Sequence, residues 1–188
     1  MSFYPENHLV DQAFENPTGF GQSHQGEIAR LVDVADLCLK PFAEARSGIE
    51  LALSADDPWH RYWGLIACSR FAGQASSFVT SAKRLAQNDF NLLVRTRAAE
   101  FLGLARAADP RRVILKVLAQ SKSGVETNLI LNSLVLLRDG KPGYAFDITS
   151  RNLTRSGRTF SDVKRRLEYL DPNYAPPAAK KKRNKKKN

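Results

Sequence analysis

The sequence predicts an all-α fold, a short α-solenoid of about seven to eight helices. Apolar residues recur every three or four positions along most of the chain, which is typical of amphipathic helices. Helix-capping residues followed by proline recur between these stretches, and no convincing set of strands is present. Of the 188 residues, 43% are hydrophobic, which is enough for a packed core and excludes a wholly disordered chain.

The chain divides into four predicted segments. Residues 1–25 are mixed and rich in turn-forming residues, and we expect them to be irregular. Residues 26–140 carry the helical repeats, and residues 141–170 hold a loop and a closing helix. Residues 171–188 form a Pro/Lys-rich tail that is predicted to be disordered.

The first three helices are predicted from their apolar spacing and from the residues at their ends. The first begins at Gly26 and is closed by Pro41, which also suits the first turn of the second. Asp57–Pro58 begins the third, because aspartate accepts the free backbone N–H groups of a first turn and proline suits its first position. Their apolar stripes are Ile28, Leu31, Val32, Ala35 and Leu39; Phe42, Ala45, Ile49, Ala52 and Leu53; and Trp59, Tyr62, Trp63, Ile66 and Ala67.

The later helices are predicted in the same way. Each has apolar residues at helical spacing and begins after a turn or capping signal. The stretch from residue 144 to residue 157 has no clear period. The predicted starts are Phe78, the turn and cap Asn88–Asp89, the cap signal Asp109–Pro110, and Gly124, with a closing helix over residues 161–170.

Arg61, Arg95 and Asn128 occupy corresponding positions in three segments that align with one another. They lie 34 and 33 residues apart, which leaves room for one helix pair per unit and is typical of an α-solenoid. A turn aspartate and an arginine on the next helix would suit a ladder between units. The alternative is a helix cap beside a solvated arginine, because exposed pairs contribute little. The residues that resemble a short HEAT-like repeat, Val-Arg-x-x-Ala-Ala-x-x-Leu-Gly, are Val94, Arg95, Ala98, Ala99, Leu102 and Gly103.

The segment Asp57–Gly64, with the sequence Asp-Pro-Trp-His-Arg-Tyr-Trp-Gly, is more specific than a generic repeat. Together with the repeat after it and the run Gly124–Leu137, it resembles the C-terminal HEAT-like extension of arylsulfatase-like enzymes from planctomycete-type bacteria. The resemblance covers residues 26–170. Within it, Glu27–Leu37 is similar to the stretch that joins the sulfatase domain to this extension. The resemblance implies a module that packs against a protein partner, such as a sulfatase catalytic domain.

The catalytic part of such an enzyme is missing from this sequence. A sulfatase needs a Cys/Ser-x-Pro-x-Arg motif that is converted to formylglycine, and neither Cys38 nor Cys68 is followed by that pattern. Calcium and formylglycine would belong to the missing domain, so we expect no catalytic, cofactor or metal site here. Both cysteines are expected to be buried free thiols. The prediction is a non-catalytic scaffold or interaction module.

Two groups of side chains are candidates for interactions. The aromatic residues at helical spacing could form a ligand platform, and the alternative is that they pack in the core. Several arginines, among them Arg106, Arg111 and Arg112, could line one groove that holds a nucleic-acid backbone, and the alternative is a solvated helix face. The predicted interaction residues are Trp59, Arg61, Tyr62, Trp63, Arg95 and Arg97.

The net charge of +10 is concentrated at the C-terminus. The last nine residues hold 7 of the 29 Lys and Arg residues, which leaves 22 basic against 19 acidic residues elsewhere. Such a tail predicts weak, salt-dependent binding to polyanions, so the alternative function is a HEAT-repeat protein that binds nucleic acid or another polyanion. Neither a secretory signal nor a membrane span is expected, although the sulfatases it resembles are usually exported. The basic residues of the tail are Lys180, Lys181, Lys182, Arg183, Lys185, Lys186 and Lys187.

Overall fold

The computed structural model describes residues 12–13, 15–140, 142–148, 153–154 and 161–171. Within these ranges all regular secondary structure is helical and no strand occurs, so the predicted all-α class is confirmed. None of the described helices is both long enough and apolar enough to cross a bilayer, as expected. The predicted lysine tail lies outside the described residues.

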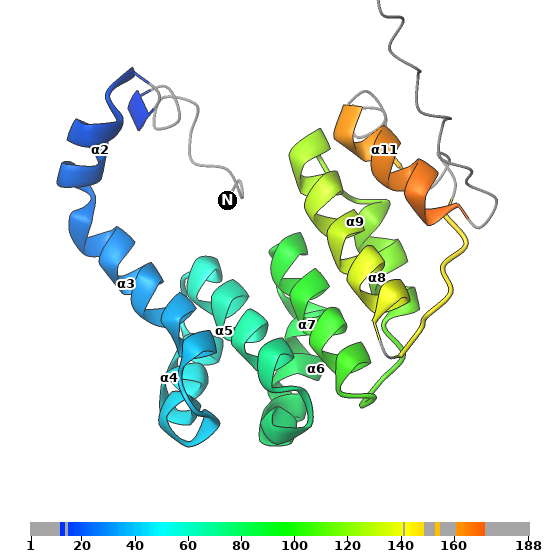
Figure 1. Ribbon diagram of the computed structural model, residues 1–188, viewed down its shortest axis with the longest axis horizontal. Helices are drawn as coiled ribbons and strands as arrows, with labels where there is room; N and C mark the ends of the chain where they lie inside the picture. Colours follow the sequence, from blue (N-terminus) through cyan, green and yellow to red (C-terminus); the bar gives the residue numbers. More distant parts are fainter. Residues whose placement is uncertain (1–11, 14, 141, 149–152, 155–160, 172–188) are drawn as a thin grey trace, which may run out of the picture.

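Six helices form three pairs that pack in series along an arc (Figure 1). Neighbouring pairs are in contact through the second helix of each, and each second helix also contacts the first helix of its own pair. This is the arrangement of stacked helix pairs, each of which covers the apolar side of the next. The pairs are α4 (Phe42–Ser54) with α5 (Pro58–Phe71), α6 (Val79–Asn88) with α7 (Leu92–Leu104), and α8 (Arg111–Leu118) with α9 (Gly124–Asp139).

The core runs through the whole stack and is densest at α7. Nine residues of this helix are buried, more than in any other described helix, because α5, α6, α8 and α9 all pack against it. Phe101 is fully buried at its centre. At the far end, α11 (Ser161–Leu170) packs on α9 and buries Val163 and Leu170. This closing helix has the bounds that the sequence predicts.

The closest approach of α4 and α5 explains the glycine of the Tyr-Trp-Gly run. A Cβ atom added at Gly64 would lie 2.9 Å from the Cβ of Ala52 and 3.4 Å from Leu53. Any side chain at this position would therefore push the two helices of the first pair apart.

The helix starts follow the capping signals with one correction. The Asp57 side chain accepts from the Trp59 backbone N–H at 2.8 Å, as predicted for α5. The predicted cap of α7 at Asn88–Asp89 is wrong by two residues. The Asn91 side chain caps this helix by accepting from the amides of Leu93 and Val94.

The prediction of an irregular segment over residues 1–25 is wrong for its described second half. Helix α2 spans Pro17–Ser23, and α3 (Gln25–Ala35) follows it directly. The Asn16 side chain accepts from the Gly19 amide at 2.9 Å, and Pro17 occupies the first turn. Asn16–Pro17 is therefore the same cap-and-proline signal that begins α5 at Asp57–Pro58.

Candidate functional site

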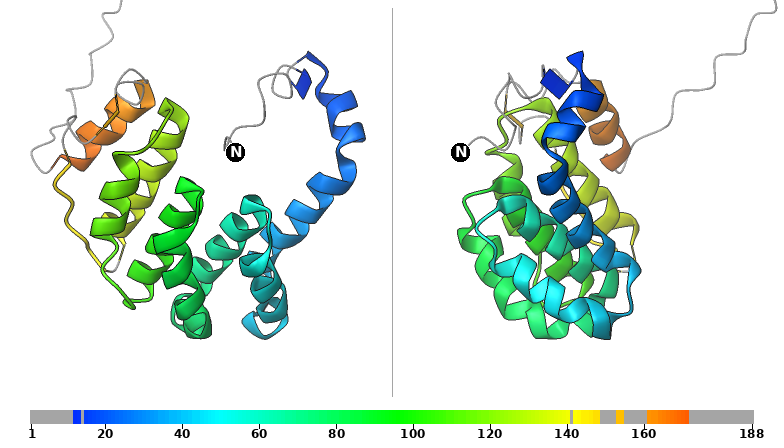
Figure 2. Two further views of the ribbon diagram at one scale, coloured as in Figure 1. Left: turned by 180° about the vertical axis from the view of Figure 1, so that it is seen from behind. Right: turned by 90° about the vertical axis from the view of Figure 1, so that its left-hand side faces the viewer.

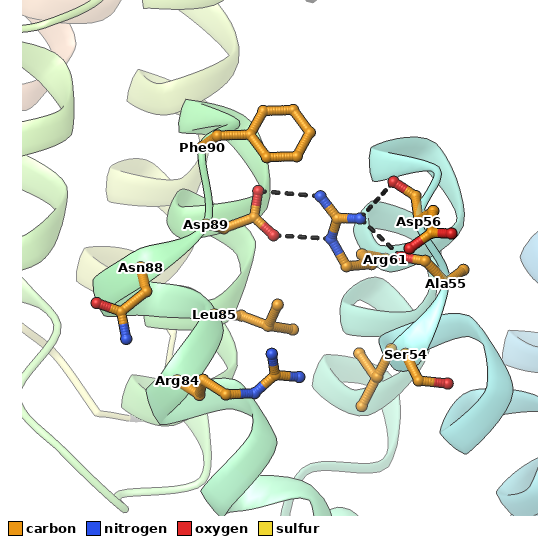
Figure 3. Close-up of a pocket in the computed structure, with 10 residues that line it drawn as sticks. Ser54, Ala55, Asp56, Arg61, Arg84, Leu85, Asn88, Asp89 and Phe90 are labelled. Carbon is orange, nitrogen blue, oxygen red and sulfur yellow. Dashed lines mark hydrogen bonds and ion pairs between the residues drawn. The ribbon is translucent and has the colours of Figure 1, made fainter.

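The junction between the first two helix pairs is organised around the guanidinium of Arg61. Its Nε and Nη2 atoms donate to Oδ2 and Oδ1 of Asp89 at 2.7 and 3.1 Å. Its Nη1 donates to the carbonyl oxygens of Ala55 and Asp56 at 2.7 and 2.8 Å. Asp89 also accepts from the Asn91 amide at 2.9 Å. One side chain of α5 therefore binds both the loop before its own helix and the loop before α7 (Figure 3).

This ion pair is almost completely shielded from solvent. The Arg61 and Asp89 side chains are 8% and 3% exposed, and Phe90 covers the guanidinium at 5.2 Å from its ring centre. A bidentate arginine–carboxylate pair whose guanidinium also donates to two carbonyl oxygens is a strong and geometrically specific contact. The predicted ladder is thus confirmed at this junction, where the alternative of a solvated arginine is wrong.

Arg95 lies at the corresponding position of the next unit but makes weaker contacts. Its Nε donates to the carbonyl oxygen of Ala86 at 3.2 Å, and its Nη1 donates to Oε1 of Gln120 at 3.3 Å. The partner is an exposed carboxamide rather than a buried carboxylate. In the third unit the corresponding residue is Asn128, which carries a carboxamide instead of a guanidinium. Its buried Oδ1 has no hydrogen-bond partner among the described residues.

A second polar cluster, centred on Arg97, links α7 to α5 and α9. Its Nη2 donates to the hydroxyl of Tyr62 on α5 at 2.9 Å, and its Nη1 donates to Oε2 of Glu100 at 2.7 Å and to the hydroxyl of Ser133 on α9 at 3.5 Å. Burial alone would lower the pKa of Arg97, but the Glu100 carboxylate and Tyr62 reverse this and raise the pKa. Arg97 therefore stays charged and binds within the chain.

The aromatic residues of α5 pack edge to face around Tyr62. The ring centres of Trp59 and Trp63 lie 6.0 and 5.9 Å from that of Tyr62. Tyr62 is buried, whereas both tryptophans are partly buried and pack against the core. Of the six predicted interaction residues, the structure thus uses Arg61, Tyr62, Arg95 and Arg97 in contacts between helices. Binding of a partner by any of the six stays a prediction.

Both cysteines are free thiols, as predicted, but only Cys68 is buried, so the prediction of burial is wrong for Cys38. Cys68 is fully buried on α5, and this burial raises its pKa to about 12. Cys38 is partly buried, and burial also raises its pKa. Burial therefore favours the protonated form of both thiols. No group of three or more metal-ligating side chains occurs within the part of the chain that the structure describes.

Two cavities are lined by residues of α4 and α6, and one of them lies beside the Arg61–Asp89 pair. The cavity next to the pair has a volume of about 290 Å³ and the other about 280 Å³. Leu53, Ser54 and Arg84 line both, so the two form one groove, which we call the α4–α6 groove. In Figure 3 the Arg84 guanidinium extends from α6 toward α4 below the ion pair. Arg84 and Phe90 were not among the residues that the sequence singled out, since neither belongs to a recurring pattern.

Helix α3 presents an apolar surface that nothing in the described chain covers. Leu31 and Val34 are partly buried on the side toward the stack, whereas Ile28 and Val32 remain 42% and 49% exposed. No residue of α3 is buried, although the sequence predicts Ile28, Leu31 and Val32 as part of one core stripe. Leu39, at the end of the same predicted stripe, is 83% exposed. We call Ile28 and Val32 the uncovered α3 stripe. Figure 2 shows α2 and the start of α3 standing away from the three helix pairs.

Comparison with known proteins gives no match. No family model matches the chain, and neither a curated protein nor a solved structure matches it.

Proposed function

We propose that this chain is a non-catalytic interaction module of the kind that the HEAT-like extension of planctomycete-type sulfatases represents. The observation that carries the proposal is what the segment Asp57–Gly64 does. Asp57 caps α5, Arg61 joins two helix pairs, and Gly64 allows α4 and α5 to approach. The most specific residues of the resemblance thus serve the packing of a helical stack, which is what a scaffold requires.

The uncovered α3 stripe supports a protein partner at the N-terminal end of the stack. The stripe lies within Glu27–Leu37, the stretch that resembles the connection to a sulfatase domain. Exposed apolar side chains on one helix face gain stability when a second surface removes them from water. We therefore propose that a sulfatase catalytic domain covers Ile28 and Val32.

This proposal is tested by mixing the full chain with a planctomycete-type arylsulfatase from which the C-terminal extension has been deleted. We expect a 1:1 complex in sedimentation velocity and a higher Tm of the truncated enzyme. Val32→Glu should abolish both effects, because it places a charge in the apolar contact. Arg30→Glu places a carboxylate at an exposed position on the opposite face of the same helix and serves as the control. Absence of a complex, or equal behaviour of the two variants, would contradict the proposal.

The non-catalytic part of the proposal has its own measurement. The purified chain should not hydrolyse an aryl sulfate in the presence of calcium. Turnover that disappears in Cys38→Ala or Cys68→Ala would show that one thiol supplies a catalytic group, and it would overturn this part.

A second candidate function, polyanion binding, is favoured by the charge on α6 and α8. Neither helix contains an acidic residue, and all of their basic residues are exposed. These exposed cations are better placed to meet a polyanion than the predicted Arg95 and Arg97, whose guanidinium groups bind within the chain. Deleting residues 180–188 and measuring DNA and RNA binding at physiological salt separates the body from the tail: binding that survives would favour this function over the scaffold. The exposed cations without an ion-pair partner among the described residues are Lys83, Arg84, Arg112 and Lys116, whereas Arg111 pairs with Asp109 at 2.6 Å.

A further inference from the structure

The middle of the stack carries positive charge that no carboxylate neutralises. From the start of α6 to the end of α8, residues 79–118, the chain has eight basic and three acidic residues. Each of the three carboxylates is already held in an ion pair with an arginine, and the pairs are Asp89–Arg61, Glu100–Arg97 and Asp109–Arg111. The cations of this stretch that have no ion-pair partner among the described residues are Lys83, Arg84, Arg95, Arg106, Arg112 and Lys116.

Every exposed side chain on α6 and α8 can donate a hydrogen bond, and none is a carboxylate. Besides the cations, the exposed residues are Thr80, Gln87 and Asn88 on α6. Basic, hydroxyl and carboxamide side chains are the groups that contact phosphate oxygens, which accept hydrogen bonds. No large apolar side chain is exposed on either helix, whereas helices that bind a membrane surface expose an apolar face. The composition therefore favours a phosphate polymer over a lipid surface.

Lys83 lies on the side of α6 that faces away from α4. Arg84 and Asn88 line the cavities beside α4, where Glu50 and Asp56 offset the charge of Arg84. Lys83 precedes Arg84 by one position and so points about 100° away from it around the helix axis. The Lys83 ammonium is thus separate from those carboxylates.

Arg95 connects this side of α6 with the end of α8. From α7 its guanidinium donates to the carbonyl oxygen of Ala86 on α6 at 3.2 Å and to Gln120, just beyond α8, at 3.3 Å. Arg112 and Lys116 lie one turn apart on the exposed side of α8. The four cations on these three helices thus form one surface. We call Lys83, Arg95, Arg112 and Lys116 the α6–α8 face.

The repeat explains why this charge is left without a carboxylate. At the junction between the first and second pairs, Asp89 neutralises Arg61. At the junction between the second and third pairs, both acceptors of Arg95 are neutral, and the loop before α9, residues 119–123, contains no acidic residue. The second junction therefore lacks the anion that completes the first, and an anion from outside the chain can take that role.

We infer that the α6–α8 face binds the phosphate backbone of a nucleic acid, with Lys83, Arg112 and Lys116 at phosphates and Arg95 adding its charge between them. This deepens the second candidate function, on which it rests, by naming the face and the group that it binds. The face ends at α4, where the exposed carboxylates Glu44 and Glu50 accompany a single exposed cation. Because phosphate contacts carry no base information, binding should not depend on the nucleotide sequence.

The test compares two triple variants of the full chain that lose the same charge from different places. All six positions are exposed, and a thermal unfolding curve for each variant verifies that the fold is retained. Both variants keep residues 180–188, so any contribution of the tail is the same in each. The face variant combines Lys83→Gln, Arg112→Gln and Lys116→Gln, and the control variant combines Arg30→Gln, Lys40→Gln and Arg46→Gln.

Binding is measured by fluorescence anisotropy on a labelled DNA duplex and a labelled single-stranded RNA over a series of salt concentrations. The face variant should bind at least about tenfold more weakly at physiological salt than the unchanged chain. Its plot of log K against log salt for the duplex should be less steep by about 3, since each lost phosphate contact removes about one. The control variant should keep both the affinity and the slope. The nucleic acid that binds more tightly identifies the source of the phosphates.

Gln120→Glu tests the role of Arg95 without removing any cation. It places a carboxylate on the group that already accepts from Arg95, so this junction would supply its own anion. We expect binding of both nucleic acids to weaken by at least about threefold, because the new carboxylate repels phosphate. Unchanged binding would show that Arg95 does not contribute to the face.

Three outcomes would overturn the inference. The first is equal weakening in the face and control variants, which would mean that net charge alone governs binding. The second is unchanged binding by both, which would place polyanion binding outside the face while leaving that candidate function intact. The third is tighter binding of dextran sulfate than of either nucleic acid at equal charge concentration, or displacement of the nucleic acid by anionic lipid vesicles. If the full chain binds neither nucleic acid, the second candidate function fails as well, whereas the complex with a sulfatase domain is tested separately.

Discussion

Arg61 and Arg95 lie at the same position of two successive repeat units, yet they contribute differently to the stack. Arg61 makes four hydrogen bonds in a shielded site, two of them to a carboxylate. Arg95 makes two longer ones, to a carbonyl and to an exposed carboxamide. The repeat fixes where the guanidinium lies, and the loop of the following unit determines what it can bind. Sequence periodicity therefore predicts the position of a contact better than its energy.

The same trend continues along the stack. Asn128, the third residue in the series, has a buried carbonyl oxygen without a partner among the described residues. The polar connection between units thus weakens from α5 toward α9. In a stack of repeats the stability depends on the contacts between neighbours, so we expect the first junction to be the one whose loss is most costly.

The largest effect is expected from Arg61→Ala. This variant leaves the Asp89 carboxylate, 3% exposed, without its main partner, and breaking a buried pair from one side typically costs about 3–5 kcal/mol. The free energy of unfolding, measured by urea denaturation, should fall by this amount. Arg95→Ala is the matched control from the next unit. Equal losses in the two variants would remove the distinction between the junctions.

A double variant separates the interaction energy of Arg61 with Asp89 from the cost of leaving one buried charge without its partner. In Arg61→Met combined with Asp89→Leu, no charge is left in the site, and replacing a buried pair by apolar residues is often nearly neutral. We expect the double variant to recover about 2 kcal/mol relative to the sum of the single variants. Full additivity in this double-mutant cycle would mean that Arg61 and Asp89 act independently. The recovery will not be complete, because Asp89 also accepts from the Asn91 amide.

Arg95→Ala alone should lower the free energy of unfolding by about 1 kcal/mol. Two neutral acceptors at 3.2 and 3.3 Å, one of them exposed, are worth no more than ordinary hydrogen bonds. A loss of 3 kcal/mol or more in urea denaturation would show that this junction is as strong as the first.

Gln120→Glu gives the second junction an arginine–carboxylate pair like that of the first. It offers Arg95 a carboxylate in place of a carboxamide at an exposed position. The gain should stay below about 1 kcal/mol, because exposed ion pairs are hydrated and screened. It should also decrease when the salt concentration of the denaturation experiment is raised. A gain that is large and independent of salt would mean that carboxylate chemistry, rather than burial, makes the Arg61 junction strong.

The sequence predicts most of the fold because its signals are local. Apolar spacing, the cap at Asp57 and the predicted start at Gly124 identify helices of the stack, and the 34-residue period identifies the pairs. The α2 helix was missed because Asn16–Pro17 also suits a turn. Only the hydrogen bond from the Gly19 amide to the Asn16 side chain identifies it as a helix cap. Ile28 and Val32 were predicted as core because a periodic stripe shows that a helix has an apolar face, without showing what covers it.

The site is less predictable, because its residues are brought together from distant parts of the chain. Asp89 was interpreted as a helix cap, and only the packing of α5 against α7 brings it to Arg61, 28 positions earlier. Arg84 lines a cavity together with the end of α4 and the loop that follows it, about 30 positions earlier in the sequence. No spacing within the sequence encodes that arrangement. The capping signals do indicate where the loops of the site begin, because Asp57 and Asp89 precede α5 and α7, the second helices of two neighbouring pairs.

The smallest expected effect concerns the exposed counterpart of these junctions, where α11 meets the end of α9. Arg138 donates to Asp139 at 2.7 Å and to the carbonyl oxygen of Tyr169 at 2.6 Å, and the Tyr169 hydroxyl donates to Asp139 at 2.9 Å. The hydrogen bond from Arg138, with that from Tyr169, holds the pKa of Asp139 below its ordinary value. An aspartate whose pKa is lowered in the folded state stabilises that state above its unfolded pKa, and this stabilisation disappears as the pH falls through the lower, folded pKa. The effect should stay below about 1 kcal/mol, because the Asp139 side chain is 42% exposed.

Hydrogen exchange of the α11 amides should therefore accelerate slightly between neutral pH and the acidic range, after correction for the intrinsic rate. Asp139→Asn should remove this pH dependence, while Asp162→Asn, which alters an exposed aspartate within α11, should retain it. If both variants keep the dependence, the attachment of α11 rests on Val163 and Leu170 alone, and the contrast between shielded and exposed ion pairs does not extend to this end of the stack.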